Sequence, residues 1–170
     1  MAVIIDLDMT LVDSSSAIQL RKQRRWSDVY RVIASFSMYD GVRELLNTLI
    51  DRNVPVCIVT SSPRPYCERV LRHFDIACAS SVCYHDTKQH KPHPAPIVLA
   101  LQNLSVDAGQ AVSIGDEPRD IAASRAANVT ALAALWGASD PTALMAAQPD
   151  AAFETPNELQ SHLRSMFRGS

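Results

Sequence analysis

The sequence lacks an excess of charge of either sign, and it lacks any apolar run long enough to cross a membrane. Its 170 residues include 16 Lys or Arg and 18 Asp or Glu, which gives a formal net charge of −2. The longest apolar stretches, residues 96–101 and 131–136, are far shorter than a membrane span. We therefore expect no membrane partner, and the overall charge does not favour a nucleic-acid partner.

A secretory signal and a paired-cysteine motif are also missing. Asp6 and Asp8 interrupt the first apolar run and no basic residue precedes it, so no signal peptide is expected. No two of the four cysteines have CxxC spacing, and Cys57 lies inside a Val/Ile run. We therefore expect reduced, partly buried thiols and a cytoplasmic location.

What the sequence does contain is an alternation of β-rich runs and helical periodicity, without internal repeats. Predicted strands cover residues 3–7, 54–59, 79–84, 111–114 and 129–135. Predicted helices cover residues 26–36, 42–49, 66–74, 96–104, 118–127 and 156–167. This order, in a chain with 47% hydrophobic and 20% charged residues, predicts a single α/β domain over residues 1–170. Its core would be a doubly wound parallel sheet covered by helices on both faces.

Polar side chains follow four of the predicted strands. They are Asp6, Asp8 and Thr10 after the first strand, Thr60 and Ser61 after the second, Lys91 beyond the third, and Asp116 and Asp120 after the fourth. Right-handed crossovers bring the carboxyl ends of parallel strands to one edge, where ligands bind. Four crowded carboxylates need a cation, and oxygen ligands suit Mg²⁺. Such a metal facing a lysine and hydroxyl donors predicts a pocket for a phosphoryl group.

Asp6 and Asp8 are two residues apart, a spacing that suits two different catalytic roles. Side chains in a strand alternate with period two, so both carboxylates point to the same side. One of them can attack phosphorus while the other donates a proton to the leaving oxygen.

The order of these segments resembles that of the haloacid dehalogenase-like superfamily. Its four motifs are similar to DLDMT (residues 6–10), the strand ending in Thr60–Ser61, KPHP (residues 91–94) and GDEPRD (residues 115–120). The resemblance extends through DGVRELL (residues 40–46) and the ALWG stretch ending at Gly137. It implies a Rossmann-like fold and a phosphatase that works through an aspartyl-phosphate.

The resemblance also implies a role for each residue. Asp6 would be the nucleophile, and Asp8 would protonate the leaving group and then activate water. Thr60, with Ser61 nearby, would hold the phosphoryl oxygens, and Lys91 would neutralise Asp6 and the phosphate. Mg²⁺ would be bound by Asp6, the main-chain carbonyl of Asp8, and Asp116, while Asp120 would support the metal or orient Lys91. Dehalogenases of the superfamily lack an acid at the position of Asp8, so that residue favours phosphoryl chemistry.

The cap that covers the site in similar phosphatases is strongly reduced here. Only residues 14–39 are available for it, enough for about one helix and its connections. Trp26, Val29, Ile33 and Phe36 fall at helical spacing within this insert. Among relatives, a minimal cap implies either a large substrate or a lid contributed by a neighbouring subunit. A homo-oligomer is therefore one of the alternatives. A minimal cap argues against phosphonate hydrolysis and mutase chemistry.

Two further clusters admit alternative interpretations. The insert carries a basic cluster, which is either a solvated helix face or a surface that attracts an anionic substrate or partner: Arg21, Lys22, Arg24, Arg25 and Arg31. A loop contains Cys83, His85, His90 and His93, for which a zinc site is an alternative to solvated histidines, one of them at the substrate entrance.

The sequence therefore predicts a Mg²⁺-dependent phosphomonoesterase acting on a small or moderately sized phosphate ester. One alternative is a phosphatase for a phosphoprotein or a nucleic-acid end. The other is a non-catalytic domain that binds a partner through its basic helix.

Overall fold

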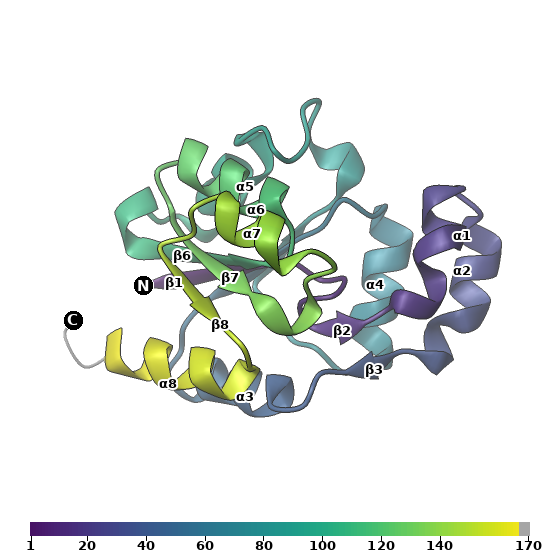
Figure 1. The fold of residues 1–170 in the computed structure, drawn as a ribbon, viewed down its shortest axis with the longest axis horizontal. Coiled ribbons are helices and arrows are strands. Elements are labelled where there is room, and N and C mark those ends of the chain that lie inside the picture. The colour runs from purple at the N-terminus through teal and green to yellow at the C-terminus, as the bar shows by residue number, and fades with distance from the viewer. Residues whose placement is uncertain (167–170) are drawn as a thin grey trace.

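The computed structural model describes residues 1–166, and its centre is a six-stranded parallel sheet (Figure 1). The strands are β1 (Ala2–Ile5), β4 (Val56–Val59), β5 (Ser80–Val82), β6 (Ala111–Gly115), β7 (Thr130–Ala134) and β8 (Ala151–Phe153). Their order across the sheet is β5-β4-β1-β6-β7-β8. The chain thus winds outward from β1 in both directions, which confirms the doubly wound, Rossmann-like architecture.

The central strands are apolar because both of their faces are covered. Every residue of β1, β4 and β6 is buried. Ile5 of β1 pairs with Ile58 of β4 on one side and with Ile114 of β6 on the other. The three strands therefore end at the same level, and the residues that follow them emerge together.

Helices cover the two faces of the sheet. They are α3 (Val42–Asp51), α4 (Arg64–His73), α5 (Ala95–Leu104), α6 (Pro118–Ala126), α7 (Pro141–Ala146) and α8 (Pro156–Met166). Val3 and Ile5 belong to the core cluster that includes residues of α3, α4 and α8. Ala2 and Ile4 point the other way, into a cluster with residues of α5 and α6. The predicted terminal helix is present as α8; its last predicted residue, Phe167, lies outside the described residues.

The segment between β1 and α3 differs from the single helix that periodicity predicts. It contains β2 (Val12–Asp13), α1 (Ile18–Lys22), α2 (Trp26–Val32) and β3 (Ser37–Met38), with short 3₁₀ turns before α1 and after α2. β2 and β3 pair as a small antiparallel ribbon. The predicted helix is interrupted because α2 gives way to a 3₁₀ turn at Ile33–Ser35, and α1 adds a helix that has little apolar periodicity of its own.

The insert is fixed to the core by aromatic packing. The ring of Trp26 lies 5.7 Å from that of Tyr66 on α4, and the ring of Phe36 lies 6.5 Å away from it. Tyr66 is fully buried beneath them. These contacts place α1 and α2 beside α4, at the right of the view in Figure 1.

The chain beyond β7 contains two elements that were not predicted, α7 and the edge strand β8.

The four cysteines carry free thiols, and three of them are buried. None of the helices in the described part of the chain combines the length and apolarity that a membrane crossing requires.

Candidate active site

A buried lysine joins two carboxylates at the carboxyl end of the sheet. The Lys91 ammonium lies 2.6 Å from Asp6 Oδ1 and 2.6 Å from Asp120 Oδ1, and it also donates to the carbonyl of Val59 at 3.0 Å. Only 4% of the Lys91 side chain is exposed. The loop carrying Lys91 thus turns back over the ends of β1, β4 and β6, as the order of motifs predicts.

Asp116 completes a group of three carboxylates. Oxygens of Asp6, Asp116 and Asp120 all lie within 4.8 Å of one another. Thr10 Oγ1 donates to Asp116 Oδ1 at 2.7 Å, which fixes the orientation of that carboxylate. Hard carboxylate oxygens in a largely buried group are the donor set that Mg²⁺ prefers, so these residues fit the metal.

Electrostatics point to the same fit. Burial, reinforced by the charges of Asp6 and Asp120, raises the pKa of Asp116 to about 9. Burial also raises the pKa of Asp6 to about 7, Lys91 opposes this rise, and Asp120 adds to it. Burial would lower the pKa of Lys91, but Asp120 and Asp6 together hold it above its usual range. The lysine offsets part of the negative charge, and a divalent cation would offset the rest.

The Asp8 carboxylate belongs to a different set of contacts. It accepts hydrogen bonds from Ser14 Oγ at 2.7 Å, from Ser62 Oγ at 3.1 Å and from the Tyr66 hydroxyl, and it forms an ion pair with Arg21. All four partners come from outside the predicted motifs: two lie on the insert, Ser62 follows β4 and Tyr66 lies on α4. Only the main-chain carbonyl of Asp8 was predicted as a metal ligand, and its carboxylate does not join the group of three.

The residues after β4 line the cavity in front of Asp6. Thr60 Oγ1 accepts a hydrogen bond from the backbone N–H of Ser62 at 3.1 Å, which leaves the hydroxyl proton of Thr60 available to a ligand. Thr60 and Ser61 both line the cavity. Ser62, which sequence reasoning passed over, lines it too and connects this loop to Asp8.

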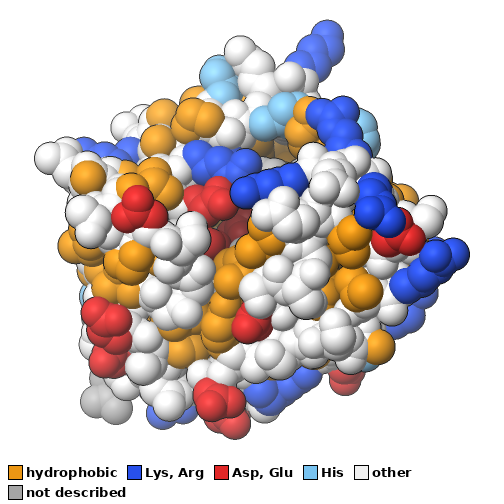
Figure 2. Space-filling view, turned by 45° about the vertical axis from the view of Figure 1, so that its right-hand side comes forward, with side chains coloured by type: hydrophobic (Ala, Val, Ile, Leu, Met, Phe, Trp, Pro, Cys, Tyr) orange, Lys and Arg blue, Asp and Glu red, His pale blue; other side chains and the backbone are white. Residues whose placement is uncertain are grey.

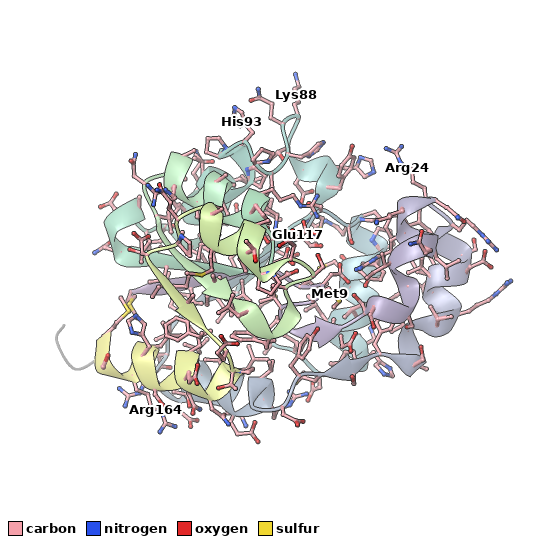
Figure 3. The ribbon with its side chains drawn as sticks, viewed as in Figure 1. Met9, Arg24, Lys88, His93, Glu117 and Arg164 are labelled. Atoms are coloured by element: carbon pink, nitrogen blue, oxygen red, sulfur yellow. The ribbon has the colours of Figure 1, made fainter. Side chains whose placement is uncertain are left out.

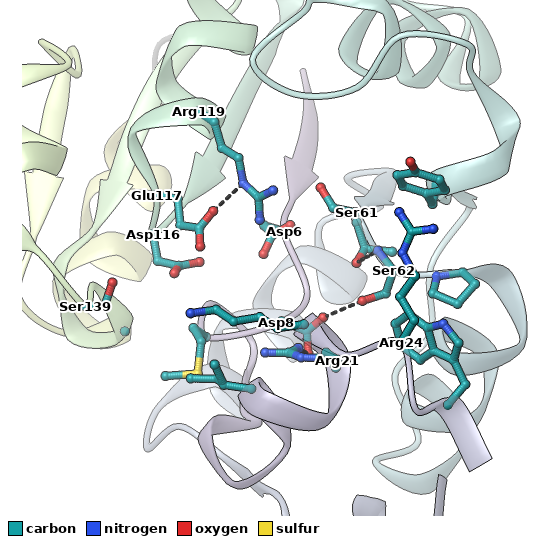
Figure 4. A pocket seen from close by; sticks show the side chains of 18 of the residues that line it. Asp6, Asp8, Arg21, Arg24, Ser61, Ser62, Asp116, Glu117, Arg119 and Ser139 are labelled. Atoms are coloured by element: carbon teal, nitrogen blue, oxygen red, sulfur yellow. Dashed lines mark hydrogen bonds and ion pairs between the residues drawn. The ribbon is translucent and has the colours of Figure 1, made fainter. Parts of the chain in front are cut away.

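These side chains surround a cavity of about 500 Å³. Figure 2 shows the hollow, with acidic side chains at its floor and basic side chains at its rim. Figure 4 shows Asp6, Asp116 and Glu117 on one side, and Ser61, Ser62 and Arg24 on the other. The insert contributes five lining residues: Ile18, Arg21, Lys22, Arg24 and Trp26. The insert between β1 and α3 therefore forms a wall of the site.

The histidine-containing loop does not form a metal site. Within residues 1–166, the group of three aspartates is the one set of metal-ligating side chains close enough to share an ion. His90 stacks on Tyr84 with ring centroids 3.9 Å apart, while His85 lines the cavity. His93 lies on the outer loop together with Lys88, away from Met9 and Glu117 (Figure 3). The zinc alternative is therefore wrong for this structure.

Comparison with known proteins identifies the family. The family described as haloacid dehalogenase-like hydrolase matches residues 21–134. A phosphoglycolate phosphatase of Xanthomonas campestris is 35% identical over 102 residues, which cover 59% of this chain and 46% of the relative. A phosphoglycolate phosphatase of Escherichia coli is 29% identical over 124 residues, covering 72% and 49% respectively.

The matched part thus amounts to about half the length of these curated relatives. A solved hydrolase from Pseudomonas syringae has the same fold, with a TM-score of 0.82, 21% identity and coverage of 96% of this chain and 98% of that one. The family match extends from the insert to the end of β7 and includes Lys91, Asp116 and Asp120. The chain belongs to the haloacid dehalogenase-like hydrolase family.

Proposed function

We propose that the protein is a Mg²⁺-dependent phosphomonoesterase in which Asp6 is the nucleophile. The observation that carries this proposal is the position of Lys91. Its ammonium lies 2.6 Å from a carboxylate oxygen of Asp6 and 2.6 Å from one of Asp120, and Asp116 lies next to both carboxylates. A buried ammonium next to a carboxylate nucleophile can neutralise a phosphoryl group as it approaches. Mg²⁺, bound by Asp6, Asp116, Asp120 and the main-chain carbonyl of Asp8, would offset the charge that builds up on the phosphoryl oxygens.

The chemistry requires two half-reactions. In the first, a carboxylate oxygen of Asp6 forms a bond to phosphorus while the ester oxygen leaves and takes a proton from Asp8. In the second, Asp8 takes a proton from water, and the hydroxide formed attacks phosphorus and releases Asp6. Thr60 and Ser61 would orient the phosphoryl oxygens through their hydroxyl protons.

The substrate we propose is a small phosphorylated molecule. The relatives' names and the wall that α1 and α2 build beside the cavity support this choice over a phosphoprotein or a nucleic-acid end. A non-catalytic role is disfavoured because three predicted acids lie together beside Lys91 and because Asp8, Thr60 and Ser61 line the same cavity. The four free thiols support the cytoplasmic location, which we also propose.

Turnover of p-nitrophenyl phosphate tests the nucleophile and the metal. Asp6→Asn is expected to lower kcat by about 10³-fold or more, and a chelator to abolish turnover until excess Mg²⁺ is restored. Asp13→Asn, the same change on β2 outside the cavity, is the matched control and should keep wild-type turnover. Wild-type rates in Asp6→Asn would exclude Asp6 as the nucleophile.

A further inference from the structure

Four acidic and four basic side chains line the cavity, but they do not all pair with one another. The acidic ones are Asp6, Asp8, Asp116 and Glu117, and the basic ones are Arg21, Lys22, Arg24 and Arg119. Arg21 is paired with Asp8, and Arg119 is paired with Glu117. Asp6 is paired with Lys91, and together with Asp116 it belongs to the predicted metal site. Two cations, Lys22 and Arg24, are left over.

Lys22 and Arg24 differ from the other basic residues of the insert. Among residues 1–166, no carboxylate lies within ion-pair distance of either side chain. Arg25 and Arg31, in contrast, both pair with Asp28, at 2.7 and 3.2 Å, and neither lines the cavity. Within the basic cluster, Lys22 and Arg24 are therefore the cations that line the cavity without an ion-pair partner, whereas Arg21 lines it as the partner of Asp8.

The backbone holds Arg24 at this position. Its φ of +56° is in the left-handed region, which is unfavourable for a residue with a side chain. The N–H of Arg24 donates to the carbonyl of Arg21 at 2.9 Å, and the N–H of Arg25 donates to that of Leu20 at 2.9 Å, which closes the end of α1. An arginine at a turn that favours glycine is placed on the cavity wall, across from Asp116 and Glu117 (Figure 4).

We propose that Lys22 and Arg24 bind a second anionic group of the substrate, separate from the phosphoryl group. This inference rests on the proposed function, because the phosphoryl group is placed at Asp6. That group would be neutralised by Lys91 and the metal, so it does not need the two cations that the insert contributes to the cavity. A cavity of about 500 Å³ leaves room for an ester whose anionic end reaches them. The specificity of this protein is thus for phosphate esters that carry a carboxylate or a comparable anion.

A pair of esters matched in size tests the proposal. We would measure kcat and KM for phosphoglycolate and for its carboxamide, and for carboxyalkyl phosphates of increasing length with their carboxamides. Wild-type protein is expected to prefer the carboxylates through KM. The variant K22A/R24A should raise KM for the carboxylates about three- to tenfold and leave the carboxamides unchanged, since each exposed charge pair contributes modestly. High salt should reduce the preference in the same way.

The double variant R25A/R31A is the matched control, because it removes two arginines of the same insert that pair with Asp28 outside the cavity. It should keep the carboxylate preference. Equal kcat/KM for carboxylate and carboxamide in the wild-type protein would overturn the proposal, as would an equal loss for both esters in K22A/R24A.

Calorimetric binding separates this proposal from the catalytic one. Titration of both esters onto Asp6→Asn protein with Mg²⁺ measures the preference without turnover. Tighter binding of the carboxylate, lost in the added K22A/R24A change, supports the second-anion site even if the wild-type rates do not support hydrolysis. Equal binding of both esters, with wild-type hydrolysis intact, would leave the phosphomonoesterase in place and remove this inference.

Discussion

Asp8 is the residue in this site with the most side-chain partners. Hydroxyls of Ser14, Ser62 and Tyr66 donate to it, and the Arg21 guanidinium pairs with it. Tyr66 is itself fully buried under the insert, so the position of Asp8 depends on how the insert packs. A carboxylate held in one orientation can exchange a proton with the leaving group and later with water at the same place.

Replacing Asp8 should affect substrates according to their leaving groups. Asp8→Asn is expected to lower kcat for alkyl phosphates by about 10²- to 10⁴-fold, because an alkoxide must be protonated as it leaves. p-Nitrophenolate leaves without a proton, so the first half-reaction should persist and the second should become slow. Rapid mixing should then show a burst of nitrophenolate equal to the enzyme concentration. If Asp8→Asn lost both the burst and the steady-state turnover, the two roles assigned to Asp8 would be contradicted. The control variant Asp13→Asn should keep wild-type kinetics with both kinds of substrate.

At the residue scale, the sequence predicts the groups that follow strands and misses those that support them. Asp6, Lys91, Asp116 and Asp120 meet because parallel strands end at one edge, which the pattern of apolar runs reveals. The contacts of Tyr66 and Arg21 with Asp8 depend instead on how α4 and the insert pack against each other. Helical periodicity marks Tyr66 only as an apolar position and gives no information about the partner of its hydroxyl.

At the scale of elements, the turn after β7 is packed against the loop after β1. Trp136 Nε1 donates to the carbonyl of Thr10 at 2.9 Å. A Cβ on Gly137 would lie 1.5 Å from the carbonyl oxygen of Met9, so only glycine allows this approach. The loop fixed in this way carries Asp8 at one end and Thr10, the partner of Asp116, at the other.

Gly137→Ala should therefore disturb the site through the backbone of the neighbouring loop, without removing a catalytic side chain. The added methyl group must push the loop of Met9 away, and we expect the free energy of unfolding to fall by about 1–3 kcal/mol. kcat should fall with it, because Asp8 and Thr10 move. Gly109→Ala is the control, since nothing lies within 4 Å of a Cβ at that position. Thermal unfolding and p-nitrophenyl phosphate turnover should be measured for both variants. If Gly137→Ala and Gly109→Ala had the same Tm and the same kcat, the close approach of Gly137 to Met9 would be unimportant.

The elements themselves were predictable where the local signal is long. β4 is a continuous apolar run, β6 is apolar except for Ser113, and α3 and α4 have a clear apolar face. β8 was missed because three residues with two alanines carry little strand propensity, and pairing with β7 determines their conformation. β2 and β3, with two residues each, are likewise set by their contact with each other.

For the molecule as a whole, the buried carboxyls of Asp6 and Asp116 couple stability to pH. In the metal-free protein the pKa of Asp116 is raised to about 9 and that of Asp6 to about 7, both from 3.8. Between about pH 4 and these values, the folded protein retains protons that the unfolded chain has released, so stability falls as pH rises through this range. Mg²⁺ needs ionised carboxylates and must displace the retained protons, so its affinity should increase with pH.

We therefore expect Mg²⁺ to raise Tm more at about pH 8 than at about pH 6, because the ionised site gains most from the cation. Calorimetry in buffers of different ionisation enthalpy should show that protons are released on binding, and fewer of them as pH approaches the pKa of Asp116. In Asp116→Asn the carboxyl with the higher pKa is gone, so the number of protons released should fall. A Tm increase that is independent of pH, without proton release, would mean that Asp6 and Asp116 are already ionised before the metal binds, contrary to their raised pKa values.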